Sequence, residues 1–257
     1  YHELGESEKS AAALERGLEF GLPVDFKARP LEALAEIYSG SGRWELAGGA
    51  FFQQGKSHFT SGELEKSTQA FQSSVTSYEK SGQPQLQAKA LHQLGRAYFK
   101  LGDTERASEP LLQSLELAPS GPLTGQVHTV LVEVYATLQQ TYENSGQWVL
   151  AGDAIFLRAV SHLELGRLQE AERAFQSSAA TYEKSSQPQL EARSLFQAGL
   201  VFYNLDHPGR ASIFLENSLS VEPFGPLARQ VHRALVDVYL ALGLTDNAEM
   251  HRKRANR

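Results

Sequence analysis

The stretch from Ala90 to Pro119 reads ALHQLGRAYFKLGDTERASEPLLQSLELAP. Apolar residues recur in it at spacings of three and four until Gly102, and a second series of this kind begins after Asp103. An aspartate at this position can cap a helix, because its carboxylate accepts a hydrogen bond from a free N–H of the first turn. Gly95 and Ala107 are small enough to let two backbones approach. The stretch therefore predicts two antiparallel helices joined by a short turn.

This hairpin resembles the tetratricopeptide repeat, a helix–turn–helix unit of about 34 residues. The residues at the family's spacing are Leu91, Leu94, Gly95, Tyr98, Ala107, Leu111, Ser114 and Pro119. Ser114 replaces the usual alanine and Leu111 the usual phenylalanine, and the rest of the chain follows the pattern more loosely. The resemblance implies an all-α fold, a solenoid of antiparallel helical hairpins.

The amino-acid composition limits the classes of protein to which the chain can belong. The chain of 257 residues is 41% hydrophobic, with no cysteine and a formal net charge of −6. No apolar run reaches the roughly 18 residues of a membrane span, so we expect no membrane insertion. The negative charge argues against general nucleic-acid binding, which depends on neutralising phosphates. The lack of cysteine excludes disulfides and thiolate sites, and we expect a cytoplasmic protein.

An ungapped internal duplication runs through the chain with an offset of 104 residues, as the pair Trp44 and Trp148 shows. Phe71–Ser74 recurs as Phe175–Ser178, and His128 recurs as His232. We divide the chain accordingly into partial N-terminal repeats (1–43), a first copy (44–147), a second copy (148–244) and a C-terminal closing helix with a basic tail (245–257). Because Tyr1 begins in the middle of a repeat pattern, we interpret the chain as a piece of a longer protein.

Start and stop signals predict about five helices in each copy. In the first copy they are Trp44–Thr60, Glu63–Ser81, Pro84–Leu101, Thr104–Leu117 and Leu123–Gln140. In the second copy they are Trp148–Leu165, Leu168–Ser186, Pro188–Leu205, Gly209–Val221 and Leu227–Leu242. Outside the copies we expect helices at about 6–20, preceded by the end of another helix, at Arg29–Tyr38 and at Thr245–Arg252. In a row of antiparallel helices, five helices in the first copy would make each helix of the second copy run opposite to its equivalent in the first. A short extra helix within Gln139–Asn144 would remove this reversal. We favour five helices without the extra one.

Residues that could carry chemistry do not form a catalytic pattern. His58 and His162 are equivalents in the duplication, as are His128 and His232, and we interpret all four as packed histidines. There is no HExxH motif, no glycine-rich phosphate loop and no nucleophile elbow in the sequence. We therefore expect no enzyme, no cofactor and no metal site.

The residues that are informative about partner binding lie on helix faces that do not pack within the hairpins. In the first copy these are Phe52, Lys56, Phe59, Lys89, His92, Arg96, Phe99 and Lys100. The resemblance implies that this flank lines a concave groove that holds an extended peptide or a partner's helix. Cations and aromatic rings together suit an acidic segment that bears aromatic residues. The alternative is a solvated basic face with its phenylalanines tucked between helices.

The second copy differs on the same flank. Its candidate contact residues are Phe156, Arg193, Phe196 and Tyr203, accompanied by Val160, Leu163 and Leu200. A flank this apolar is expected to be covered by another segment of the chain or by a partner. The family's carboxylate-clamping set of Lys, Arg and Asn is not carried over, because only Asn204 offers an asparagine on these faces.

These observations predict a protein–protein interaction scaffold or adaptor, which binds an acidic or amphipathic peptide or helix of a partner. Two alternatives stay open. The chain could be an obligate structural subunit inside a larger multiprotein complex, or a regulatory receptor that closes around a peptide or effector.

Overall fold

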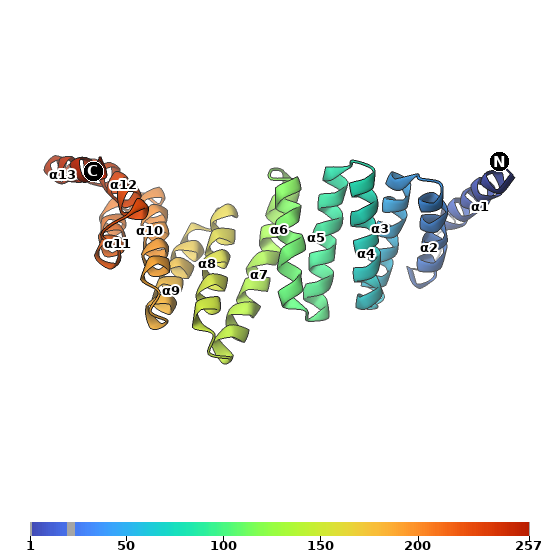
Figure 1. Ribbon diagram of the computed structural model, residues 1–257, viewed down its shortest axis with the longest axis horizontal. Helices are drawn as coiled ribbons and strands as arrows, with labels where there is room; N and C mark the ends of the chain where they lie inside the picture. The colour runs from blue at the N-terminus through green and yellow to red at the C-terminus, as the bar shows by residue number, and fades with distance from the viewer. Residues whose placement is uncertain (1, 20–23, 257) are drawn as a thin grey trace. The chain divides into compact units, whose positions relative to one another are not determined.

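We describe the protein from a computed structural model, which defines residues 2–19 and 24–256. These residues form thirteen α-helices and no strand (Figure 1). The helices of the N-terminal half are α1 (His2–Glu19), α2 (Val24–Gly40), α3 (Trp44–Thr60), α4 (Leu64–Lys80), α5 (Pro84–Leu101) and α6 (Thr104–Leu117). They are followed by α7 (Pro122–Asn144), α8 (Trp148–Glu164), α9 (Leu168–Lys184), α10 (Pro188–Asn204), α11 (Pro208–Val221), α12 (Pro226–Ala241) and α13 (Thr245–Ala255).

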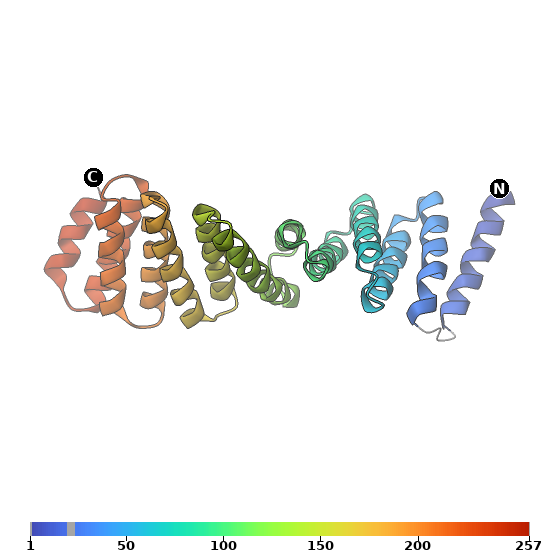
Figure 2. The ribbon, with the colours of Figure 1, turned by 90° about the horizontal axis from the view of Figure 1, so that it is seen from below.

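The chain divides into two compact units, residues 1–130 and 131–257, and the boundary falls inside α7. Within the first unit each helix from α1 to α6 packs against the next one in the chain, and within the second the same holds from α8 to α13 (Figures 1 and 2). Packing of consecutive antiparallel helices is the arrangement of an α-solenoid. The all-α, tetratricopeptide-like fold expected from the sequence is therefore confirmed.

The hairpin of α5 and α6 forms as its sequence predicts. Gly102 takes the left-handed conformation after α5, with φ of 87°, and the carboxylate of Asp103 accepts a hydrogen bond from the backbone N–H of Arg106 at 3.3 Å. A Cβ on Gly95 would lie 2.6 Å from Cγ of Leu111. The two helices thus cross at a point where only a glycine fits on α5.

Buried serines tie the second helix of a hairpin to the first. Ser114 of α6 donates its hydroxyl to the carbonyl of Ala88 on α5 at 2.8 Å, and Ser74 of α4 donates to the carbonyl of Gly48 on α3 at 2.9 Å. The corresponding bonds in the second unit join Ser178 to Gly152 and Ser218 to Ala192. Because all four hydroxyls are buried, each bond satisfies groups that water cannot reach.

In each unit a pair of phenylalanines lies in the core of one hairpin. Phe71 of α4 and Phe175 of α9 are fully buried, and each meets a phenylalanine of the preceding helix edge-on, Phe52 at 5.7 Å and Phe156 at 5.2 Å between ring centroids. Such edge-to-face pairs are favourable beyond the area they bury. The core is therefore continuous from one helix of a pair to the other.

Helix boundaries differ from the sequence expectation in three places. The expected break near Gly5 is absent, because α1 runs unbroken from His2 to Glu19, and a single glycine need not end a helix. At its other end α1 stops at Glu19, and the expected Phe20 lies outside the described residues. Helix α2 is longer than the expected Arg29–Tyr38. Helix α7 continues to Asn144, so residues 139–144 extend it and hold no separate helix.

The count of five helices in residues 44–147 and five in 148–244 is confirmed. Among the described helices, none combines the length and the apolar character that crossing a bilayer requires.

Candidate partner-binding face

The structure brings three of the first-copy candidates, Phe59, Arg96 and Lys100, into contact between α3 and α5. The ring of Phe59 on α3 lies beneath two cations of α5, the guanidinium of Arg96 with its Cζ 5.4 Å from the ring centroid and the ammonium of Lys100 at 4.6 Å. Cation–π contacts of this kind are each worth about 0.5–1 kcal/mol at exposed positions. We use the name basic face for the residues Phe52, Lys56, Phe59, Lys89, Arg96, Phe99 and Lys100.

The cations of the basic face are not neutralised by the chain. Lys56, Lys89 and Lys100 are exposed, Arg96 is half-buried, and among the described residues none of the four forms an ion pair. Arg96 does hold one neutral partner, because its guanidinium donates to the side-chain oxygen of Gln93 at 3.1 Å. The positive charge on this face is therefore available to another molecule.

The phenylalanines of the basic face are partly fixed by contacts with the core. Phe52 and Phe59 are half-buried and pack against the cluster that contains Phe71, and Phe99 is also half-buried. Each of these rings keeps part of its surface in contact with solvent. A ring fixed on one side by the core can contact a partner with the other side at little cost in side-chain entropy.

His92 was expected on this face, and the structure places it inside. It is only 3% exposed, and burial, reinforced by the nearby charge of Arg96, lowers its pKa from 6.5 to about 4. The expectation that His92 contacts a partner is wrong, because its position on α5 adjoins Leu91 and Gly95, which face the core. His92 is a neutral, packed histidine at pH 7.

The second-copy candidates are only partly assembled. The guanidinium of Arg193 on α10 lies 4.9 Å from the ring centroid of Phe156 on α8, and Tyr203 is exposed near the end of α10. Phe196 is 8% exposed and belongs to the core formed with Phe202 and Leu215, so its expected role at the surface is wrong.

The remaining apolar residues of the second-copy flank are largely covered by the chain itself. Val160 and Leu163 are partly buried against the core around Phe175, and Leu200 against the core around Leu215. Residues that the sequence of one helix predicts to be exposed are thus packed against the neighbouring helices.

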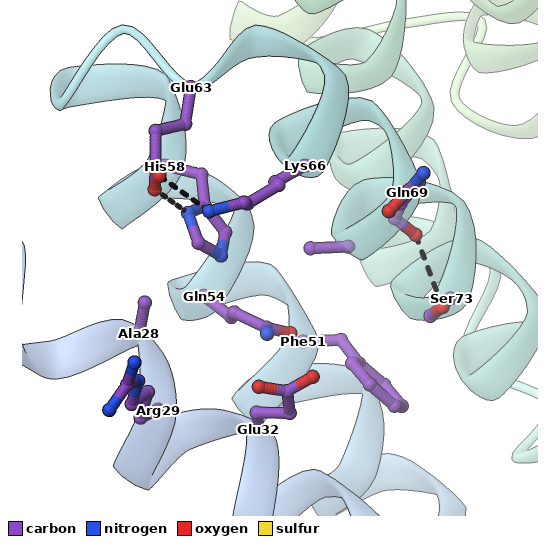
Figure 3. Close-up of a pocket in the computed structure, with 11 residues that line it drawn as sticks. Ala28, Arg29, Glu32, Phe51, Gln54, His58, Glu63, Lys66, Gln69 and Ser73 are labelled. Atoms are coloured by element: carbon purple, nitrogen blue, oxygen red, sulfur yellow. Dashed lines mark hydrogen bonds and ion pairs between the residues drawn. The ribbon is translucent and has the colours of Figure 1, made fainter.

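The structure also contains a cleft that the sequence reasoning missed. It has a volume of about 790 Å³ and lies over α3, between α2 and α4 (Figure 3). Arg29 and Glu32 line it from α2, and Lys66 and Gln69 from α4. The side chain of Gln54, only 7% exposed, lies at its centre.

One wall of this cleft is a charged cluster. Nδ1 of His58 and Nζ of Lys66 each lie 2.6 Å from an oxygen of Glu63, and these contacts, that of Lys66 first, lower the pKa of Glu63. The contacts join the end of α3 to the start of α4, so they stabilise the turn between them. The spacing of His58 and Glu63 across a glycine turn could have predicted their contact. The cleft itself also depends on the position of α2, which no local sequence pattern predicts.

The other histidines follow the sequence interpretation. His58, His128 and His232 are buried and His162 is partly buried, as expected of packed residues. In the described part of the chain no group of three or more histidine and acidic side chains is arranged to hold a metal ion.

Comparison with known families agrees with this architecture. Residues 88–120, which span most of α5 and all of α6, match a family model described as tetratricopeptide repeat, and so do residues 153–185, which cover most of α8 and all of α9. The hairpins formed by α5 with α6 and by α8 with α9 are therefore tetratricopeptide repeats. Proteins of this family generally bind other proteins and are generally not enzymes. No curated protein sequence matches the chain.

Solved structures resemble the chain at low similarity. BtubC (BKLC) from P. vanneervenii is 16% identical over 100% of this chain and 89% of that one, with a TM-score of 0.41. MamA (41-end) from Desulfovibrio magneticus RS-1 is 13% identical over 81% of this chain and 92% of that one, with a TM-score of 0.36. Aspartyl phosphate phosphatase F from Bacillus subtilis is 17% identical over 95% of this chain and 59% of that one, with a TM-score of 0.43. Likenesses at this level identify no function.

Proposed function

We propose that the protein is an interaction scaffold whose basic face binds an acidic segment, with aromatic residues, of a partner protein. The observation that carries the proposal is the contact of Phe59 with Arg96 and Lys100, two cations that form no ion pair among the described residues. Acidic side chains of the partner would pair with these cations, and its aromatic residues would pack on the exposed part of the rings.

Charge and ring contribute in different ways. The unpaired cations speed the encounter with an acidic segment and set its orientation, an effect that weakens as salt screens the charges. The rings supply the desolvated contacts that dominate binding free energy at protein interfaces. Because α3 and α5 are already ordered, the cost of ordering falls on the partner alone.

On the second unit, the contact of Arg193 with Phe156 repeats this chemistry on a smaller scale, and Tyr203 is exposed further along α10. We assign it to a second, more apolar part of the same kind of partner. Phe156 corresponds to the ring of Phe52 in the duplication.

A specific observation favours the second candidate function, an obligate subunit of a larger complex. Trp148, Val149 and Leu150 are consecutive at the start of α8, and all three are exposed. Exposed large apolar side chains concentrated at one end of a helix favour a surface that a partner covers. If this function holds, the isolated chain self-associates or aggregates as its concentration rises, whereas a scaffold stays monomeric.

The experiment that tests the scaffold compares capture of partners from native lysate by the wild-type chain and by a Phe52→Ala, Lys56→Glu, Arg96→Glu variant. The control carries Lys9→Glu and Arg233→Glu, two charge reversals at exposed positions of α1 and α12 outside the basic face. Circular dichroism first confirms that all three proteins are equally helical.

The scaffold predicts a stoichiometric partner that binds the wild-type and control proteins, is lost from the face variant, and dissociates as salt is raised. Equal retention of that partner by the face variant would show that the basic face is not the site.

A further inference from the structure

A second cleft lies in the C-terminal unit, among α11, α12 and α13, which are neighbours in Figure 1. Its volume of about 850 Å³ is in the range of small-molecule sites, roughly 300–1,000 Å³. The residues that line it come from the end of α11, the loop 222–225, the start of α12 and the end of α13.

One side of the cleft is apolar. Leu219 of α11 and Ala228 of α12 are buried at its base, and Phe224 stands on its rim in the loop between these helices. The side chain of Phe224 is 82% exposed, more than any other large hydrophobic residue of the described chain. A phenylalanine held this far into solvent beside an open cleft gives a ligand's apolar body a surface to pack on.

The opposite side is positively polarised. Helix α12 begins here, Gly225 at its N-cap makes no side-chain cap bond, and the first turn carries no acidic residue. Arg229 of α12 and Arg254 of α13 both line the cleft, and neither forms an ion pair among the described residues. Free N–H groups and the dipole at a helix start favour an anion, and two arginines beside them strengthen that preference.

A buried polar side chain also opens on the cleft. His232 is 9% exposed, and its Nδ1 lies 2.8 Å from Nδ1 of His251. The one acid among the described lining residues, Glu216, is already engaged: it accepts a hydrogen bond from the hydroxyl of Tyr239 at 3.1 Å and lies 3.2 Å from Nε2 of His251.

We propose that this cleft binds a small organic anion whose charged group is joined to an aromatic or aliphatic body. The charged group lies against Arg229, Arg254 and the start of α12, and the apolar body packs on Leu219, Ala228 and Phe224. The proposal is independent of the basic face, because it uses no residue of α3 or α5.

The test uses phenyl phosphate as the probe, titrated into the full chain at pH 7.5 and followed by calorimetry and by amide chemical shifts. Inorganic phosphate and phenol, the two halves of the probe, are titrated separately. We expect saturable binding of phenyl phosphate that is tighter than that of either half, with shifts at the amides of Gly225, residues 227–232 and the neighbours of Arg254.

Variants identify the site. Arg229→Gln and Arg254→Gln are each expected to weaken binding about tenfold, as loss of a hydrogen bond to a charged group does. The matched control is Arg233→Gln on the same helix, which removes the same charge at a position that does not line the cleft and leaves binding unchanged.

A phosphotyrosine peptide distinguishes the two sources of this chemistry. Tighter binding than phenyl phosphate assigns the anion to a polypeptide, and equal or weaker binding assigns it to a free molecule. The proposal is overturned if phenyl phosphate does not saturate a site, or if both cleft variants bind it as Arg233→Gln does.

Discussion

Replacement of Gly95 by alanine tests the closest helix crossing in the first unit. A Cβ at this position would lie 2.6 Å from Cγ of Leu111 and 2.9 Å from the carbonyl oxygen of Ala107. The leucine side chain can rotate away, but the carbonyl belongs to the backbone of α6 and cannot move without the helix. We therefore expect α5 and α6 to be pushed apart.

The magnitude is the difference between two opposing effects. Alanine is the better helix former by about 0.8–1.0 kcal/mol, whereas overpacking of a tight contact costs about 1–3 kcal/mol. Because one of the contacts is with backbone, we place the packing cost at the upper end, which leaves a net loss of about 1–2 kcal/mol.

Two other glycines give matched controls. The nearest atoms to a Cβ on Gly199 are those of the Leu215 side chain at 2.7 Å, with the backbone oxygen of Ala211 at 3.4 Å, so Gly199→Ala should cost less. At Gly49 the nearest atom lies at 3.7 Å, an ordinary contact, so Gly49→Ala should stabilise α3 by up to about 1 kcal/mol.

The assay is amide hydrogen exchange across α5 and α6, combined with urea unfolding of the whole chain. Exchange is the sharper measurement, because repeat proteins lose stability locally and a global transition averages the effect. A Gly95→Ala protein with α5 and α6 as protected as in the wild type would refute the reasoning, and so would equal losses at Gly95 and Gly49.

Three further predictions concern the same hairpin. Asp103→Ala removes the cap of α6 and should lower the free energy of unfolding by about 1 kcal/mol in urea titrations, whereas Asp103→Asn keeps most of it. Ser114→Ala leaves the buried carbonyl of Ala88 without its hydroxyl donor and should lower the stability of the α5–α6 hairpin by about 1–3 kcal/mol. Amide hydrogen exchange in α5 and α6 measures this loss. His92, with a pKa of about 4 when folded against 6.5 when unfolded, is neutral in the folded protein while the unfolded chain gains a proton below pH 6.5. Its contribution is therefore complete above pH 6.5 and is lost as the pH falls toward 4, by about 3 kcal/mol in all. Urea midpoints at pH 7 and 4.5 measure this loss, and His92→Leu should be less sensitive to acid than the wild type.

Local patterns were sufficient to predict most of the helices, although the bounds of α1, α2 and α7 differ. The turn at Gly102 and Asp103 can be predicted from the types of these two residues. The close contact of Gly95 with the neighbouring helix can likewise be predicted from its lack of a side chain. The five helices in residues 44–147 followed from the same kind of signal, glycines and prolines between apolar series. Such features depend on residues that lie within a single helical hairpin.

The candidate face could be predicted only in part, because a helix carries more than one face. Lys89 and His92 are three residues apart on α5, yet Lys89 is exposed and His92 is buried under the neighbouring helices. Only the position of those neighbours separates the two. The same limit hid the cleft over α3, one wall of which comes from Arg29 and Glu32 on α2.

The serine bonds within the hairpins have a consequence for how such a protein can change. Ser74 and Ser114 donate to carbonyl oxygens of the preceding helix, and every amino acid supplies that acceptor. Substitutions on the outward side of α3 or α5 therefore leave the tie between the helices in place. Binding specificity and hairpin stability are set by different atoms, so a new partner can be acquired by surface substitution while the scaffold beneath keeps its geometry.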